Sequence, residues 1–281
     1  MTLELIKSSF KVLRLDKELL LFPLCSTLVL IMLWTGVAFF IFLSISHYFT
    51  QVFETFDPST LETFDPSTVE NYGILLILAF YILTHFVITF FNTALVASVL
   101  MRLDGRNPTL MDGLRLAASR FWPIFIWSVL FGSLSMILKV LEKRLPLFQS
   151  MMVSILGLGF SLCSYFVVPF LVQEKLYPIA ALKKSSQLIK KTWGKVLVTE
   201  VGVWLFGFLM FWLGIGFVAV IAVLTGGLGG YLFLGLIVYI SLLWLFCVTV
   251  SGIITASVFA YASKGVVLDG FSKDSVETAF R

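Results

Sequence analysis

The residues best suited to chemistry interrupt a long apolar run in the first third of the chain. Tyr81, His85, Thr89 and Asn92 follow one another at spacings of four, four and three, so they lie along one face of a helix. Such a stripe can line a path for a proton, an ion or a polar head group, with His85 as the titratable member. The alternative is that these side chains hold neighbouring helices together by hydrogen bonds.

Glu200 is the fifth member of this candidate set. It lies about 6 Å inside a later apolar run, and Asn92 lies about 13 Å from the corresponding end of its own run. The two side chains can meet if their helices are neighbours, whereas His85, at about 24 Å, is too far away for a direct pair. Two alternatives stay open for Glu200, namely extension to the membrane interface and a salt bridge with Lys191 or Lys195.

Residue patterns typical of enzymes and metal sites are missing from the sequence. The two histidines fall at different depths, and no loop pairs a serine or cysteine nucleophile with a base. The letters GIGFVA at 214–219 match a nucleotide-binding fingerprint, but they fall inside an apolar helix rather than after a strand. We therefore expect a non-enzymatic protein with no cofactor, no metal and no nucleic-acid partner.

The composition indicates that lipid surrounds most of the chain. Hydrophobic residues make up 59% of the 281 residues, charged residues make up 13%, and the mean hydropathy is +1.01. A soluble domain has roughly 45–50% apolar and about 25% charged residues. The three cysteines all fall in apolar runs, where free thiols are expected.

Six apolar stretches are long enough to cross a bilayer as helices, since a span needs about 20 residues. They cover residues 19–46, 73–101, 121–141, 151–172, 196–224 and 231–262. The sequence therefore predicts an all-α, polytopic transmembrane helical bundle that forms one integral membrane domain over residues 1–281. Pro169 is expected to kink the fourth span near its inner end.

The distribution of positive charge predicts the orientation. All lysines and arginines except Lys139, Lys143 and Arg144 fall in the N-terminal segment, the second and fourth loops, or the tail at 263–281. Basic residues concentrate on the cytoplasmic side of membrane proteins. We expect a multi-pass protein of the cell (inner, cytoplasmic) membrane with both termini in the cytoplasm.

Three basic amphipathic segments each precede a pair of spans. They begin near residues 3, 109 and 178, the second with a capping box formed by Thr109 and Asp112. Expected breaks at 22–23, 122–123 and 193–194 separate them from the spans that follow. This organisation predicts a threefold repeat of amphipathic helix plus hairpin.

An acidic loop is expected at 47–72, between the first two spans. It contains a tandem duplication, ETFDPST at 54–60 and again at 62–68. Its acids lack the spacing of a calcium-binding loop, so a solvated hairpin tip is the preferred interpretation and a cation site is the alternative.

Basic residues in the amphipathic segments are candidates for contact with anionic lipid, at about 1 kcal/mol per base near the surface. The candidates are Lys7, Lys11, Arg14, Lys183, Lys184, Lys190 and Lys191. Alternatively, these bases only fix the orientation. The expected partners are membrane lipids, with a homo-oligomer or a membrane protein partner as further alternatives.

The chain resembles a family of unknown function that consists of prokaryotic six-span integral membrane proteins. That family is more loosely similar to the membrane domain of glycerophosphodiester phosphodiesterases. The resemblance rests on SSFKVLRLDKELLLFP at 8–23, FFNTALVASVLMRLDGRNPTLMDGL at 90–114, FVVPFLVQE at 166–174, LKKSSQLIKKTWG at 182–194 and FAYASKGVVLDGF at 259–271. It implies a membrane bundle and carries over no catalytic residue.

Two functions follow from these observations. The first is a non-enzymatic accessory or scaffold protein of the envelope, whose basic cytoplasmic collar engages anionic lipid or a membrane partner. The alternative is a small transporter or channel subunit that uses the intramembrane polar stripe.

Overall fold

The computed structural model describes Leu13 and residues 16–55, 66–225 and 229–264. Within these ranges the chain is helical and contains no strand. The elements are η1 (Lys17–Leu20), α2 (Leu21–Thr55), α4 (Pro66–Leu103), α5 (Leu110–Ala118), α6 (Phe121–Arg144), α7 (Leu147–Cys163), α8 (Val167–Gln173), α9 (Pro178–Thr225) and α10 (Gly229–Lys264).

The prediction of six apolar spans is confirmed. Six helical segments are long and apolar enough to cross a membrane: Lys17–Leu43, Leu75–Arg102, Phe121–Arg144, Gln149–Gln173, Glu200–Val223 and Tyr231–Ser263. Their apolar side chains point outward on much of each helix, as at Met32, which is 73% exposed, and Phe42, which is 65% exposed. Exposed apolar surface on this scale is typical of helices that contact lipid.

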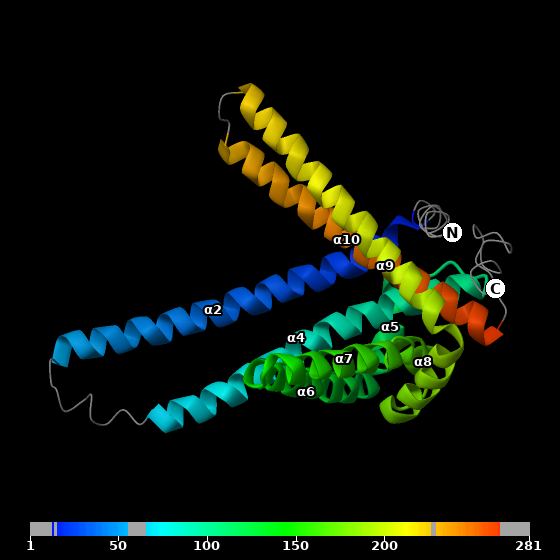
Figure 1. Cartoon of the computed structure of the whole chain (residues 1–281), viewed down its shortest axis with the longest axis horizontal. Helices are drawn as coiled ribbons and strands as arrows, with labels where there is room; N and C mark the ends of the chain where they lie inside the picture. Colours follow the sequence, from blue (N-terminus) through cyan, green and yellow to red (C-terminus); the bar gives the residue numbers. More distant parts are fainter. Residues whose placement is uncertain (1–12, 14–15, 56–65, 226–228, 265–281) are drawn as a thin grey trace.

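The helices form three hairpins that meet at one end of the molecule (Figure 1). The α2–α4 and α9–α10 hairpins point in different directions, α6 packs against α4, and α7 packs against α6. The meeting point is formed by η1, α5, α8 and the first turns of α9. We call this the basic end, because it contains Arg102, Arg106, Arg115, Lys175 and Lys183.

Helix α4 is the centre of the bundle, since it contacts α2, α5, α6, α8 and α10. Its small residues Ala94 and Ala97 are fully buried, and Leu95 and Val99 are 1% exposed. The main core also includes Phe166 and Phe259, which are fully buried. The best-packed part of the protein therefore lies toward the basic end, and the loop ends of the hairpins diverge.

Turn residues fix the end of α4 and the start of α5. Gly105, with φ of 79°, follows α4, and the N–H groups of Gly105 and Arg106 donate to the carbonyls of Arg102 and Met101 at 3.0 and 3.2 Å. This is a Schellman motif, which satisfies the last carbonyls of a helix. The predicted capping box at the start of α5 is confirmed, with Thr109 as the N-cap and Asp112 three residues later.

The fourth span is interrupted upstream of Pro169. Helix α7 ends at Cys163 and α8 begins at Val167, which places Pro169 in the first turn of α8, where a missing N–H is tolerated. The N–H of Phe166, inside the interruption, donates to Ser185 Oγ of α9 at 3.0 Å. The expected distortion of this span near Pro169 is present, and a side chain from another helix satisfies the freed backbone group.

Two expectations about boundaries were wrong. Helix α9 continues without a break through 193–194, so the third amphipathic segment and the fifth span are one helix of 48 residues. The expected loop at 47–72 is partly helical, because α2 continues to Thr55 and α4 begins at Pro66, with 56–65 outside the described residues. A single glycine costs a helix only about 1 kcal/mol, which tertiary contacts readily offset. The first amphipathic segment lies almost wholly outside the described residues, and the threefold repeat stays a prediction.

The contact between α4 and α5 at Gly113 gives a test of the packing. A Cβ at this position would meet Ser98 Oγ, Phe22 Cζ at 2.7 Å and the carbonyl oxygen of Ala94 at 2.8 Å. We expect Gly113→Ala to destabilise the protein by about 1–3 kcal/mol, because the backbone of α4 cannot move away without disturbing the core. Thermal unfolding in detergent measures the effect.

Gly36→Ala is the matched control, because Gly36 lies in helix α2 with no atom within 4 Å of its Cβ position. There the change should stabilise the helix by up to about 1 kcal/mol. Equal melting temperatures for the two variants would contradict the described packing of α5.

Candidate functional site

A carboxylate network joins three segments of the bundle inside the spans. Tyr165 OH lies 2.6 Å from Glu200 Oε1, and Ser251 Oγ lies 3.0 and 2.9 Å from the two oxygens of the same carboxylate. Thr255 Oγ1 lies 2.9 Å from Tyr165 OH. A carboxylate inside a span is costly without partners, and here two hydroxyl groups donate to it.

Local structure explains how these groups meet. Tyr165 lies in the interruption between α7 and α8, which turns the chain toward α9 and α10. Ser251 and Thr255 are four residues apart on α10 and therefore share one helix face. Glu200 reaches them because α9 and α10 pack together as a hairpin. Tyr165, Ser251 and Thr255 were not among the residues predicted from the sequence. For Ser251 and Thr255, the four-residue spacing of two hydroxyls in an apolar run was the available signal.

A lateral cavity of about 330 Å³ adjoins this network. Residues from α2, α4, α9 and α10 line it, and the Glu200 partners Ser251 and Thr255 form part of the wall. The rings of Trp204 and Trp244, with centroids 5.5 Å apart, also line it. These two side chains are 50% and 56% exposed. The lateral cavity therefore combines polar hydroxyl groups with an apolar, lipid-facing rim.

The predicted polar stripe divides between two environments. The members farther from the basic end face α6: the ring centroids of His85 and Phe131 lie 4.5 Å apart, and Lys139 Nζ lies 3.5 Å from Tyr81 OH. Thr89 is buried, and its Oγ1 lies 3.2 Å from His85 Nδ1. These contacts link α4 to α6 and arrange three of the five candidates as a packed interface.

Asn92 and Glu200 lie apart from that interface and do not bond to each other. Asn92 lines the lateral cavity, where its Oδ1 lies 3.7 Å from the Cβ position of Gly252 on α10. Glu200 bonds instead to Tyr165 and Ser251. The structure thus brings Asn92 and the Glu200 network to the same cavity, although the side chains are not in direct contact.

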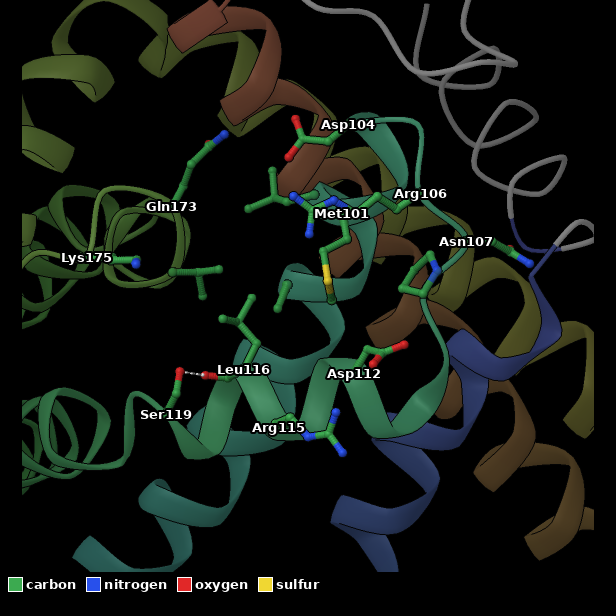
Figure 2. A pocket seen from close by; sticks show the side chains of 14 residues that line it. Met101, Asp104, Arg106, Asn107, Asp112, Arg115, Leu116, Ser119, Gln173 and Lys175 are labelled. Carbon is green, nitrogen blue, oxygen red and sulfur yellow. Dashed lines mark hydrogen bonds between the residues drawn. The ribbon is translucent and has the colours of Figure 1, made fainter.

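A second cavity, of about 750 Å³, opens at the basic end (Figure 2). It lies between the α4–α5 connection, helix α5 and the segment that follows α8. Figure 2 shows Gln173 and Lys175 on one side and Arg106 and Arg115 across from them. We call it the basic-end cavity.

The charges of the basic-end cavity are unequally satisfied. Arg106, Arg115 and Lys175 are exposed and form no salt bridge among the residues that the structure describes. The two acids that line the cavity both have partners. Asp112 accepts hydrogen bonds from Thr109 in the capping box, and Asp104 also takes part in a polar or electrostatic contact. The cavity therefore presents three cationic groups to an anion, of which Arg115 also interacts electrostatically with Asp112.

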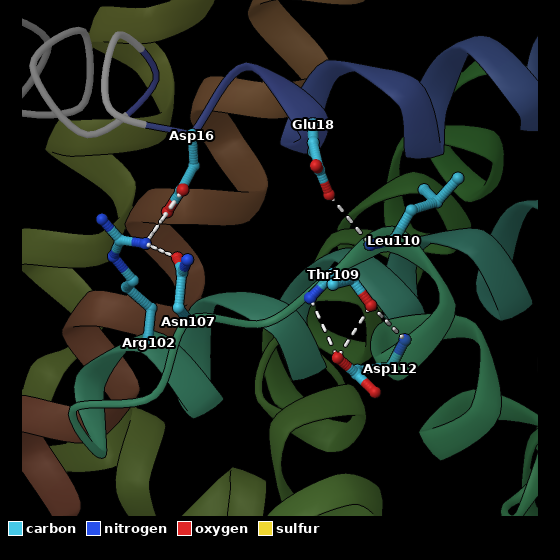
Figure 3. A network of polar contacts seen from close by, with 7 residues as sticks. All are labelled: Asp16, Glu18, Arg102, Asn107, Thr109, Leu110 and Asp112. Atoms are coloured by element: carbon cyan, nitrogen blue, oxygen red, sulfur yellow. Dashed lines mark hydrogen bonds and ion pairs between the residues drawn. The ribbon is translucent and has the colours of Figure 1, made fainter.

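Long-range polar contacts hold the basic end together (Figure 3). Arg102 forms a salt bridge with Asp16 at 2.9 Å and also donates to Asn107 Oδ1 at 2.6 Å. Glu18 Oε2 accepts a hydrogen bond from the N–H of Leu110, the first residue of α5, at 3.0 Å. A carboxylate at a helix N-terminus satisfies an orphan donor and complements the helix dipole. The start of the first span thus positions α5.

The candidate lipid contacts fall partly outside the described structure. Lys183, Lys184 and Lys190 are exposed on the first turns of α9, and Lys184 forms a salt bridge with Glu174. Lys7, Lys11 and Arg14 lie outside the described residues, as does the side chain of Lys191.

Comparison with known proteins shows which family the chain resembles. A profile for a family of unknown function, DUF6159, matches residues 71–269, from the second span to the start of the tail. The chain belongs to the DUF6159 family. No curated protein and no solved structure matches the chain significantly. The matched region contains the carboxylate network and the basic-end cavity, and it leaves out α2.

The capping box predicts a specific pH dependence of stability. Hydrogen bonds from the backbone N–H and the hydroxyl of Thr109 lower the pKa of Asp112 below its usual value, and Arg115 adds to this effect. A carboxyl group with a lowered pKa in the folded state stabilises the protein above its unfolded pKa, and this contribution disappears as the pH falls through the folded pKa.

We therefore expect Asp112→Asn to lower the melting temperature between about pH 5 and 7, with the two curves converging below the ordinary aspartate pKa of about 3.9. Thermal unfolding of both proteins in detergent across this range measures it. A difference that stays constant down to the lowest pH would show that the charge of Asp112 does not contribute.

Proposed function

We propose that the protein is a non-enzymatic accessory or scaffold protein of the cell membrane whose basic end faces the cytoplasm and binds anionic lipid. The basic-end cavity is the observation that supports this most directly. Arg106, Arg115 and Lys175 surround a space of about 750 Å³, within the range of about 300–1,000 Å³ that is typical of small-ligand sites.

The position of the cavity also favours a lipid head group. Arg106 follows the second span, which ends at Arg102, and Lys175 follows the fourth span, which ends at Gln173. Both bases therefore lie within a few residues of the level where helices leave the hydrocarbon, where phosphate groups of lipids are found. Exposed Lys183 and Lys190 on α9 add positive charge at the same end.

The transporter or channel alternative receives less support from the geometry. Tyr81 and His85 contact α6, whereas Asn92 lines the lateral cavity. The described contacts therefore do not connect the stripe into one polar path. A flux assay in proteoliposomes, with His85→Ala as the comparison, separates the two functions, because a scaffold transports nothing.

Removal of the three cavity bases tests the lipid proposal. We expect the Arg106→Gln, Arg115→Gln, Lys175→Gln triple variant to bind phosphatidylglycerol about a hundredfold more weakly than the wild type, since each base contributes about 1 kcal/mol. Binding is measured by titrating phosphatidylglycerol into the protein in phosphatidylcholine nanodiscs, at low and high salt.

Lys143→Gln, Arg144→Gln is the matched control, because these exposed bases lie at the opposite end of α6. It should bind like the wild type. Equal weakening by both sets of changes, or binding that does not depend on salt, would contradict a lipid site at the basic end.

The proposed orientation makes a separate prediction. Reporters fused before residue 1 and after residue 281 should both be active on the cytoplasmic face, and a reporter inserted after Leu145, between α6 and α7, should be active on the opposite face. The reason is that basic residues resist translocation, and six spans return the chain to the side where it began. Termini on opposite faces would contradict it.

A further inference from the structure

The lateral cavity contains polar groups that no neighbouring residue satisfies. Asn92 on α4 is exposed and Ser26 on α2 is 8% exposed; both line the cavity, and neither side chain has a hydrogen-bond partner in the part of the chain that the structure describes. Many other hydroxyls in the spans donate to carbonyls of their own helices, as Thr27 does to Pro23 at 2.8 Å and Thr93 does to Thr89 at 2.6 Å. Ser26 and Asn92 lack such a bond, and both line the same cavity.

Both groups lie at the same depth. Ser26 and Asn92 are each ten residues from a partner in the Asp16–Arg102 salt bridge, which corresponds to about 15 Å along each helix. A hydrocarbon core is about 30 Å thick, so the two side chains are near its middle. An unpaired amide or hydroxyl at this depth costs a few kcal/mol, which a ligand with hydrogen-bonding groups would recover.

The lining indicates the chemistry of that ligand. Among the described residues that line the cavity there is no lysine, arginine, aspartate or glutamate, and the Glu200 carboxylate lies behind Ser251 and already accepts two hydroxyl groups. An anionic head group would meet this carboxylate without a compensating base, and any charged head is costly at such depth. Asn92 and Ser26 can each donate and accept, which suits an alcohol.

The apolar part of the cavity gives the ligand an orientation. Leu30, Ile88 and Phe91 line it together with the Trp204–Trp244 pair, and these tryptophans lie farther from the basic end than Glu200 and Ser251 do on the same helices. A lipid with its head group at Asn92 would therefore extend its chains past the tryptophans, away from the basic end.

We propose that the lateral cavity between α2, α4, α9 and α10 binds a neutral lipid alcohol of the diacylglycerol type, with its hydroxyl group held by Asn92 and Ser26. This site is distinct from the basic-end cavity in place and in chemistry. The lateral cavity recognises an uncharged head group within the membrane, and the basic-end cavity recognises an anion at the membrane surface.

Trp204 and Trp244 allow the binding to be measured by fluorescence. The full chain in phosphatidylcholine nanodiscs is titrated with diacylglycerol that has brominated acyl chains, which quench nearby tryptophans. We expect saturable quenching by this probe and only weak, non-saturating quenching by brominated phosphatidylcholine or phosphatidylglycerol. Trp204→Phe, Trp244→Phe should remove the saturable part and leave the quenching of the other five tryptophans.

Variants of the head-group contacts complete the test. We expect Asn92→Leu to weaken diacylglycerol binding about fivefold to tenfold, because a neutral hydrogen bond is lost, and Ser26→Ala, a smaller change, to weaken it in the same direction. Thr35→Val is the matched control, since Thr35 is a polar residue of α2 whose hydroxyl bonds to its own helix at Ile31. It should bind like the wild type.

Three results would overturn the proposal: equal quenching by brominated phosphatidylcholine, tighter binding of an anionic lipid, or wild-type affinity in both Asn92→Leu and Ser26→Ala. Circular dichroism and size-exclusion chromatography establish that the variants are folded. The basic-end triple variant should keep its affinity for diacylglycerol, so the failure of either lipid proposal can be recognised separately.

Discussion

The structure depends on one constraint: a polar group within hydrocarbon must find a partner inside the protein, because no water is available there. Most hydroxyls in the spans meet this requirement locally, as Ser98 and Ser128 do by donating to the carbonyls of Ala94 and Ile124 on their own helices. Glu200 cannot do so, and it takes its partners from two other segments. Polar groups that cannot be satisfied locally therefore decide where helices must meet.

These contacts concentrate toward the basic end. Ser185 accepts from the backbone of Phe166, Glu18 accepts from the first N–H of α5, and Arg102 pairs with Asp16. Each contact joins segments that are far apart in sequence. The loop ends of the α2–α4 and α9–α10 hairpins diverge by comparison (Figure 1), and their exposed apolar side chains favour contact with lipid. The bundle is therefore a packed base from which hairpins extend into the membrane.

The two cavities follow from this arrangement. Where the hairpins begin to separate, the lateral cavity forms among α2, α4, α9 and α10, with the Glu200 network behind its wall. Next to the ends of the second and fourth spans, the short helix α5 and the end of α8 leave the basic-end cavity between them. Among the described residues, the lateral cavity has no charged residue in its lining, whereas the basic-end cavity is lined by Arg106, Arg115 and Lys175. The first lies between the apolar spans, and the second lies beyond the ends of the second and fourth spans.

The sequence by itself determined the helical class, the six spans and the capping box at Thr109, because apolar run length and capping residues act over a few turns of one helix. It also indicated a distortion near Pro169. It did not reveal that α9 runs unbroken through 193–194, because one glycine costs a helix only about 1 kcal/mol and need not end it.

The polar stripe shows why a pattern on one helix cannot by itself define a site. Tyr81, His85, Thr89 and Asn92 do share a face of α4, but α6 covers the part of that face far from the basic end, and α10 approaches the part near it. The tertiary structure alone decided that Asn92 lies at a cavity and that Tyr165, Ser251 and Thr255 surround Glu200. The physical reason is that the surroundings of a side chain depend on which helices pack at its depth, and that packing is set by contacts between residues distant in sequence.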